Sequence, residues 1–417
     1  MQPKAARNIP IEALRLVAVA GIAVFHTFQW TFQAVCVGAV EYAPLAMFPY
    51  SGVLGFINLL GCWANEVFFM ISGYFLIASA ARAWDGGATW KSQMQRTAQR
   101  LGKVIMPTAF YCLVALAWST VVSPIPDVTL NTQYWYTLGL EFIWVYAATV
   151  FMAPWFGLAK SRLPQKTYTT TVIAVGILAF VVNGYLAAMS APSGGEFSWL
   201  QKLMSAATYV IAFLIGGLLR DVTGAMDSDK AGALGTRSLV TVLALATILE
   251  GALSFTGNLT AMAVLSYKST SLISFALAAA SLLFAATRRR ASGNPRTAGV
   301  IVTLSTATLG FYVMQSLTSS LWRPVFNTLL ANILISQNSP AAMCIVTGIV
   351  ISIVFALTLL TIDAARSLIT RKPKRQYTRC RQTLKPLQPW QVPAFYSKLA
   401  VKVRRAFTIG QSQGRIR

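Results

Sequence analysis

Repeated apolar runs of similar length constrain this chain more than any other feature of its sequence. A helix that crosses a hydrocarbon core about 30 Å thick needs roughly 20 apolar residues, and the runs have about that length. Charged residues make up 11% of the 417-residue chain, whereas a soluble domain typically has about 25%. Because lipid offers the backbone no hydrogen-bond partners, such runs form helices that pair their own amides and carbonyls. We therefore predict an all-α polytopic membrane protein.

The pattern predicts about ten transmembrane helices whose connections alternate in charge. The connection 81–103 carries five Lys and Arg, whereas the connections on either side of it carry acidic residues and no Lys or Arg. Because basic residues stay on the cytoplasmic side, we expect both termini in the cytoplasm and a multi-pass protein of the cytoplasmic (inner) membrane. The predicted spans are 11–33, 55–80, 104–123, 134–157, 167–190, 199–219, 237–257, 264–287, 299–322 and 340–363.

The positive charge is concentrated after the last predicted span. The formal net charge is +23, and residues 371–417 contribute 13 Lys and Arg with no Asp or Glu. This placement predicts contact with anionic membrane lipid rather than with nucleic acid. We divide the chain into a transmembrane domain, 1–370, and a basic cytoplasmic tail, 371–417. The segment 394–409 fits either an amphipathic helix on the inner leaflet or a solvated tail.

Arg15 and His26 share one face of the first predicted span. At about 100° and 1.5 Å per residue, eleven residues return to within roughly 20° and rise about 16 Å. Arg15 is then expected near the inner surface and His26 beyond the midplane. His26 is the only histidine in the chain, and an imidazole exchanges protons near neutral pH, as a general base must. For Arg15, an interfacial anchor that snorkels to the headgroups is an alternative.

Other polar residues fall inside the second and fourth predicted spans. We expect Glu66 in the outer half of the membrane, at a depth that lets it pair with His26; the alternatives are a structural ion pair or a water-facing position. Ser72 and Gly73 provide either a hydrogen bond in a pocket or close helix packing. Glu141 is also expected in the outer half. The single histidine and five cysteines without metal-type spacing predict no metal site.

Several motifs resemble the membrane acyltransferase 3 family, which includes O-acetyltransferases of bacterial surface polysaccharides. The pair of Arg15 and His26 resembles the family's first-span signature. The stretch from Glu66 to Tyr74 (EVFFMISGY) resembles its phenylalanine-pair and Ser-Gly-aromatic motif. Gln315 ends a late-span motif (LGFYVMQ) where relatives often carry histidine, which concentrates the acid–base role on His26. The other similar stretches are RLGKVIMPTAFY (100–111), the pair Trp135 and Tyr136, and YVIAFLIGGLL (209–219), so the resemblance extends over 8–363.

The resemblance implies transfer of an acyl group, with acetyl as the default, from cytoplasmic acyl-CoA to a hydroxyl of a cell-surface glycan or lipid-linked sugar. It implies His26 as the acid/base, Arg15 as a cation for the donor, and Glu66 as the residue that orients the histidine. Acyl-CoA is a donor substrate, and no bound cofactor is expected. The substrate-binding residues that we predict are Ser72, Tyr74, Arg100, Lys103, Trp135, Tyr136 and Glu141.

Two other functions are compatible with the same spans. One is a transporter or flippase for a lipid-linked sugar or small anion, and the other is a membrane scaffold without catalysis. Transporters often have repeated halves and broken helices, and neither is evident in the sequence. Consumption of acyl-CoA distinguishes the enzyme from both alternatives.

Overall fold

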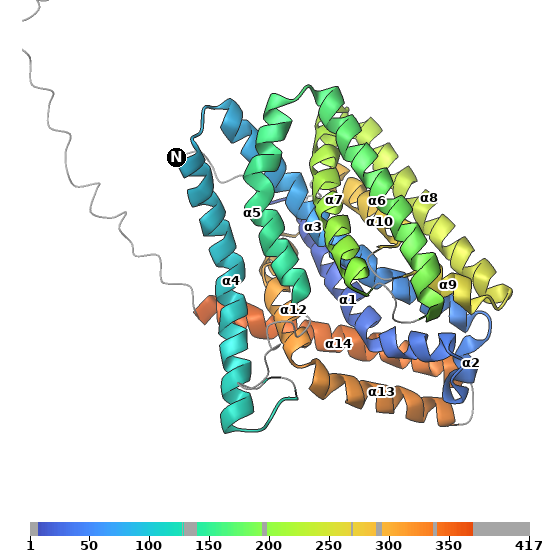
Figure 1. Ribbon diagram of the computed structural model, residues 1–417. Coiled ribbons are helices and arrows are strands. Elements are labelled where there is room, and N and C mark those ends of the chain that lie inside the picture. The colour runs from blue at the N-terminus through green and yellow to red at the C-terminus, as the bar shows by residue number, and fades with distance from the viewer. Residues whose placement is uncertain are drawn as a thin grey trace, which may run out of the picture. The chain divides into compact units, whose positions relative to one another are not determined.

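The structure, a computed structural model, is helical in all its regular elements. It describes residues 7–126, 128, 140–193, 198–267, 270–288, 294–336 and 340–369; the predicted tail, 371–417, lies outside this part of the chain. Eight of the described helices are long and apolar enough to span a membrane, which confirms the predicted all-α membrane fold. The elements, shown in Figure 1, are α1 (Ile9–Cys36), η1 (Val40–Tyr42), α2 (Ala43–Ala46), α3 (Tyr50–Asp85), α4 (Trp90–Val121), α5 (Glu141–Arg162), α6 (Gln165–Ser193), α7 (Ser198–Ala225), α8 (Ser228–Phe255), α9 (Leu259–Leu265), α10 (Leu272–Thr287), α11 (Pro295–Ser305), α12 (Thr308–Leu317), α13 (Ser319–Ile335) and α14 (Pro340–Ile369).

Every predicted span corresponds to a helix or to a pair of helices. Eight of the ten coincide with the long apolar helices α1, α3 to α8 and α14. The predicted span 264–287 corresponds to α10, which has only 16 residues, and 299–322 corresponds to α11 and α12, which are bent by 42°. The count of ten and the placement of both termini in the cytoplasm stay predictions.

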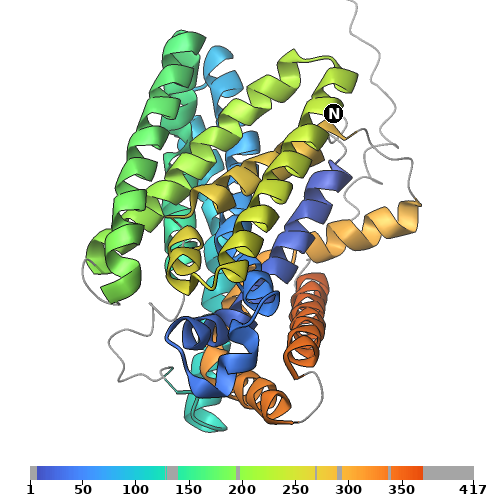
Figure 2. The ribbon, with the colours of Figure 1, turned by 90° about the vertical axis from the view of Figure 1, so that its right-hand side faces the viewer.

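Helix α3 lies at the centre of the bundle. It packs against α1, α5, α7, α8 and α10, and 72% of its most apolar stretch is buried inside the protein. A helix that is apolar on all sides is stable where other helices surround it. Figure 2, turned by 90°, shows only parts of α3, in lighter blue, behind α7, α8 and α10.

Two glycines bring the backbones of α3 and α7 into contact. A Cβ atom on Gly73 would collide with the carbonyl oxygen of Phe213, and one on Gly216 would collide with that of Met70. Small residues permit such an approach between membrane helices. Of the two predicted roles for the Ser72–Gly73 pair, close packing therefore applies to Gly73.

Hydroxyl groups bend the chain between α11 and α12. The side-chain oxygens of Ser305, Thr306 and Thr308 donate hydrogen bonds to the carbonyls of Val302, Thr303 and Ser305, at 3.1, 2.7 and 3.2 Å. Such bonds compete with the helical pattern and bend helices. No glycine or proline stands at the break, so the sequence does not mark it.

Three short turns lie at one end of the bundle, where Lys and Arg gather on the adjoining helix ends. Ser161 near the end of α5 bonds Asp85 at the end of α3, and Lys160 forms an ion pair with Asp221 near the end of α7, both at 2.5 Å. The turns α3–α4, α5–α6 and α7–α8 therefore lie at the same end, and Figure 1 shows the first two near the top of the view. We call this end the basic end.

Candidate functional site

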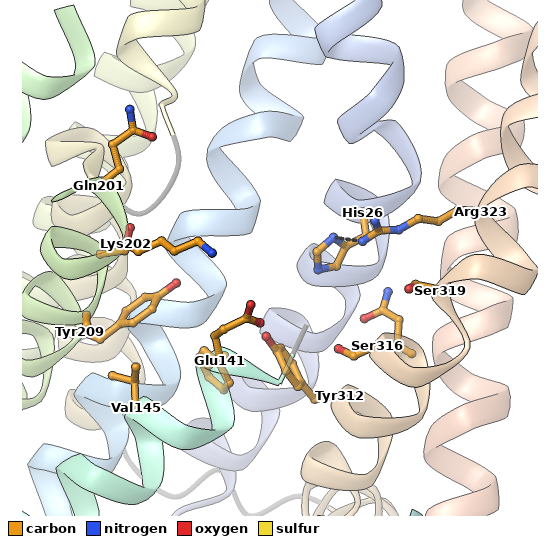
Figure 3. A pocket seen from close by; sticks show the side chains of 14 residues that line it. His26, Glu141, Val145, Gln201, Lys202, Tyr209, Tyr312, Ser316, Ser319 and Arg323 are labelled. Atoms are coloured by element: carbon orange, nitrogen blue, oxygen red, sulfur yellow. Dashed lines mark hydrogen bonds between the residues drawn. The ribbon is translucent and has the colours of Figure 1, made fainter. Parts of the chain in front are cut away.

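A cavity of about 380 Å³ lies beside His26, and we call it the His26 cavity. Residues of α1, α5, α7, α12 and α13 line it. Figure 3 shows their side chains directed toward a common space. The helices arrive from distant parts of the sequence, so the cavity exists only once the bundle is packed. Its ionisable side chains are His26, Glu141, Lys202, Tyr209, Tyr312 and Arg323.

The imidazole of His26 has two partners that require opposite tautomers. Its Nδ1 lies 3.3 Å from Nη2 of Arg323 and 3.3 Å from Oε1 of Gln29. A guanidinium can only donate, so the contact with Arg323 makes Nδ1 an acceptor and leaves the proton on Nε2. A hydrogen bond to Oε1 of Gln29 instead places the proton on Nδ1 and leaves Nε2 free to accept one. Only the second arrangement gives a base at Nε2.

Glu66 does not lie on this cavity. Its side chain is fully buried on α3, and neither carboxylate oxygen has a hydrogen-bond partner among the described residues. Nδ1 of His26 contacts Gln29 and Arg323 instead. The hydrogen bond that we predicted between Glu66 and His26 is therefore absent from the structure, and a catalytic role for Glu66 stays a prediction.

Glu141 and Gln315 both lie on the wall of the His26 cavity. Glu141 is the first residue of α5, and Figure 3 shows its carboxylate close to the ring of Tyr312. Gln315 is buried on α12, and its amide nitrogen has no partner within the described chain. A buried amide without a partner can donate to a ligand in the cavity.

A second cavity, of about 330 Å³, lies around Arg15, and we call it the Arg15 cavity. Lys103 of α4 and Ser72 of α3 also line it, as do residues at the break between α11 and α12. Arg15 donates to Oε2 of Glu12 at 2.9 Å. The hydroxyl of Ser72 donates to the Phe68 carbonyl at 2.8 Å and lies 2.9 Å from that of Tyr146. Two cations and two hydroxyls thus face one space.

Two aromatic rings separate the cavities. Phe142 and Tyr312 line both of them, and their ring centroids are 4.6 Å apart at an angle of 32°. Phe69, which is fully buried, packs edge-on against Phe142 at 5.2 Å and holds its ring from the side of α3. The two cavities are therefore back to back, with this ring pair as the shared wall.

The remaining predicted residues lie elsewhere. The hydroxyl of Tyr74 accepts from Nη1 of Arg220 at 3.0 Å, and Arg100 donates to the hydroxyl of Ser79 at 3.3 Å. Neither Tyr74 nor Arg100 lines the two cavities. Trp135 and Tyr136 lie outside the described residues.

Sequence reasoning missed most residues that close the two cavities: Phe142, Lys202, Tyr209, Tyr312 and Arg323. Two of them did stand in stretches that carried the family resemblance, Tyr209 at the start of 209–219 and Tyr312 within LGFYVMQ. For Arg323 the available signal was its position as a lone cation in the connection before the last predicted span.

Comparison with known proteins gives one match. The family model of acyltransferase 3, described as an acyltransferase domain, matches residues 8–359. This range contains all the residues that line the two cavities. No curated protein matches the chain, and no solved structure does.

Proposed function

Because the chain belongs to the acyltransferase 3 family, we propose that this membrane acyltransferase moves an acyl group, acetyl by default, from acyl-CoA to a hydroxyl of a cell-surface glycan or lipid-linked sugar. The observation that carries the proposal is the pair of cavities that share Phe142 and Tyr312. One of them offers the cations Arg15 and Lys103, which suit a phosphate-bearing donor, and the other offers His26, which suits a hydroxyl acceptor.

The donor binds in the Arg15 cavity. Arg15 has five N–H donors, so its bond to Glu12 leaves others for a CoA phosphate, and Lys103 adds a second charge. The hydroxyls of Ser72 and Tyr146 are placed to bond the amides of the pantetheine arm or the thioester carbonyl. The basic end then faces the cytoplasm, where acyl-CoA is found, and the protein resides in the cytoplasmic membrane.

His26 activates the acceptor. With the Nδ1 proton donated to Gln29, Nε2 takes the proton of the acceptor hydroxyl as its oxygen attacks the thioester carbon. The C–O bond forms, the C–S bond breaks, and the thiolate of CoA leaves and takes the proton from the imidazolium. The products are an acylated sugar and free CoA.

The thioester must pass Phe142 and Tyr312 to reach His26. Rotation of these two rings joins the cavities, and their return separates the acceptor from bulk CoA. A water-excluding wall at this position also limits hydrolysis of the thioester.

Outside the two cavities, the basic tail supplies a second contact with the membrane. Its 13 Lys and Arg and lack of acidic residues suit the anionic lipid of the inner leaflet. This contact holds the tail at the inner surface of the membrane and takes no part in acyl transfer.

The test follows label from donor to acceptor. Parent protein and His26→Ala are purified in nanodiscs and supplied with radiolabelled acetyl-CoA and an extract of envelope glycans. We expect label in glycan with the parent alone, and equal binding of acetyl-CoA by both proteins. In sealed vesicles that contain the parent protein, label that crosses the membrane without covalent attachment would instead establish a transporter. A variant as active as the parent would exclude His26 as the base.

A further inference from the structure

The two cations of the His26 cavity are unusual for their place in the bundle. Among the described residues, Lys202 and Arg323 are the two Lys or Arg at the end opposite the basic end. The other described cations lie in the half of their helix that is nearer the basic end, or just beyond that helix end. The bias that retains cations on one side of a membrane protein works against these two positions, so their presence calls for a function.

Both of these cations line the same cavity. Figure 3 shows Lys202 on α7 and Arg323 on α13, at opposite sides of the space beside His26. Helices α7 and α13 are more than 90 residues apart in the chain, so their convergence here is a result of the fold rather than of local sequence.

Neither cation is neutralised within the part of the chain that the structure describes. Lys202 forms no ion pair or hydrogen bond there, and Arg323 contacts Nδ1 of His26 and the ring of Trp322. Glu141 is the carboxylate on the same cavity wall, and it pairs with neither of them. With a neutral imidazole, two positive charges and one negative charge face the space. The cavity therefore attracts an anion.

An anion would also change the state of His26. As long as Arg323 donates to Nδ1, His26 keeps its proton on Nε2 and cannot act as a base there. Guanidinium binds a carboxylate or phosphate far better than it binds a neutral imidazole, because those bonds are charge-assisted and bidentate. An anionic ligand thus withdraws Arg323 and leaves Gln29 as the partner of Nδ1.

We propose that the acceptor is a sugar bearing an oxyanion, a carboxylate or a phosphate, which Lys202 and Arg323 bind. The inference rests on the proposed function and names its acceptor class. Binding of the oxyanion places the sugar hydroxyl beside His26, and it releases the imidazole from Arg323. A neutral sugar does neither, so the cavity selects anionic acceptors over neutral ones before any transfer occurs.

The test compares acidic with neutral acceptors. Envelope glycans are separated by anion exchange into two pools, adjusted to equal sugar concentration, and labelled from acetyl-CoA by the parent protein. We expect at least about tenfold more label in the acidic pool, the effect of one charge-assisted hydrogen bond. Chemical reduction of carboxyl groups, or removal of phosphate with a phosphatase, should abolish the preference and so identify which oxyanion is bound.

Matched variants separate this role from a structural one. Lys202→Gln and Arg323→Gln should each lower labelling of the acidic pool about tenfold, and Arg323→Lys should restore part of the loss. Arg323→Gln should also raise labelling of the neutral pool, because it frees His26 from the guanidinium. Lys230→Gln, which removes the same charge from an exposed position in the first turn of α8, should change neither pool. Equal labelling of both pools by the parent protein, or an equal fall in both pools with the variants, would overturn this inference but not the proposed function. Label in neither pool would overturn the proposed function and this inference with it.

Discussion

Gln29 lies one helical turn after His26 on α1 and positions its imidazole. Its Oε1 lies 3.3 Å from Nδ1. In the proposed reaction the imidazole becomes positive as Nε2 takes the proton of the acceptor, and the hydrogen bond from Nδ1 to Gln29 then stabilises that charge. The substitution Gln29→Leu removes this acceptor, and Arg323, the other partner of Nδ1, cannot replace it because a guanidinium only donates.

The size of the effect follows from this one bond. A hydrogen bond to a charged group contributes about 1.5–3 kcal/mol, and each 1.36 kcal/mol changes a rate about tenfold. Because Gln29 is half-buried and its contact is long at 3.3 Å, we take the lower end of the range. We expect Gln29→Leu to lower kcat about tenfold. The KM for acetyl-CoA should not change, since the donor binds on the other side of Phe142 and Tyr312.

The assay measures initial rates of acetyl transfer at varied donor concentration, with thermal unfolding as the test of fold. Gln33→Leu is the matched control, because Gln33 lies one turn further along α1 and is exposed. It should keep the rate of the parent. A Gln29→Leu protein whose kcat stays within about twofold of the parent would refute the proposed role of Gln29 and the tautomer on which it depends.

Three further predictions test other parts of the molecule. Arg15→Ala should raise the KM for acetyl-CoA about tenfold through loss of a charge-assisted bond to phosphate, without changing that for the acceptor; equal initial-rate curves would contradict this. Tyr312→Trp should narrow the passage between the two cavities and lower the rate of transfer, while calorimetry shows unchanged binding of acetyl-CoA; faster transfer would contradict a barrier at this ring. Gly216→Leu should destabilise the bundle by about 3 kcal/mol, because its side chain meets the Met70 carbonyl. Gly251→Leu, at a position with open space around it, is the control. Equal midpoints of thermal unfolding for the two variants would contradict the close crossing of α3 and α7.

Hydropathy predicted the membrane fold because lipid imposes a length on each apolar run. It was less informative where helices extend beyond the apolar region. The third predicted span begins at 104, whereas α4 begins at Trp90, because its first three turns are polar and basic and carry no hydropathy signal. The bend between α11 and α12 was also beyond prediction, since it depends on hydroxyl–carbonyl bonds that a Ser/Thr-containing helix need not make.

The candidate site was predictable only where a single helix carries it. Helical periodicity alone suggested that Arg15 and His26 share a face of α1, and the structure places one in each of two cavities with a common wall. Lys202 and Arg323 reach the site from α7 and α13, and one sequence does not reveal which faces of different helices meet. Glu66 illustrates the same limit, because its expected depth suggested His26 as a partner but could not give the direction of its side chain around α3.

The central position of α3 has a consequence for how the protein is made. Gly73 of α3 emerges from the ribosome 143 residues before Gly216 of α7 (216 − 73), the glycine at the same crossing. At about 5–20 residues per second, that interval lasts on the order of ten to thirty seconds. Throughout it, the helix that will be the most enclosed in the bundle faces lipid or the insertion machinery, and the carboxyl group of Glu66 is not yet enclosed by the later helices. A carboxylate in hydrocarbon is costly. During synthesis, α3 is therefore the segment of the nascent chain that most needs contact with another protein until its partner helices have been made.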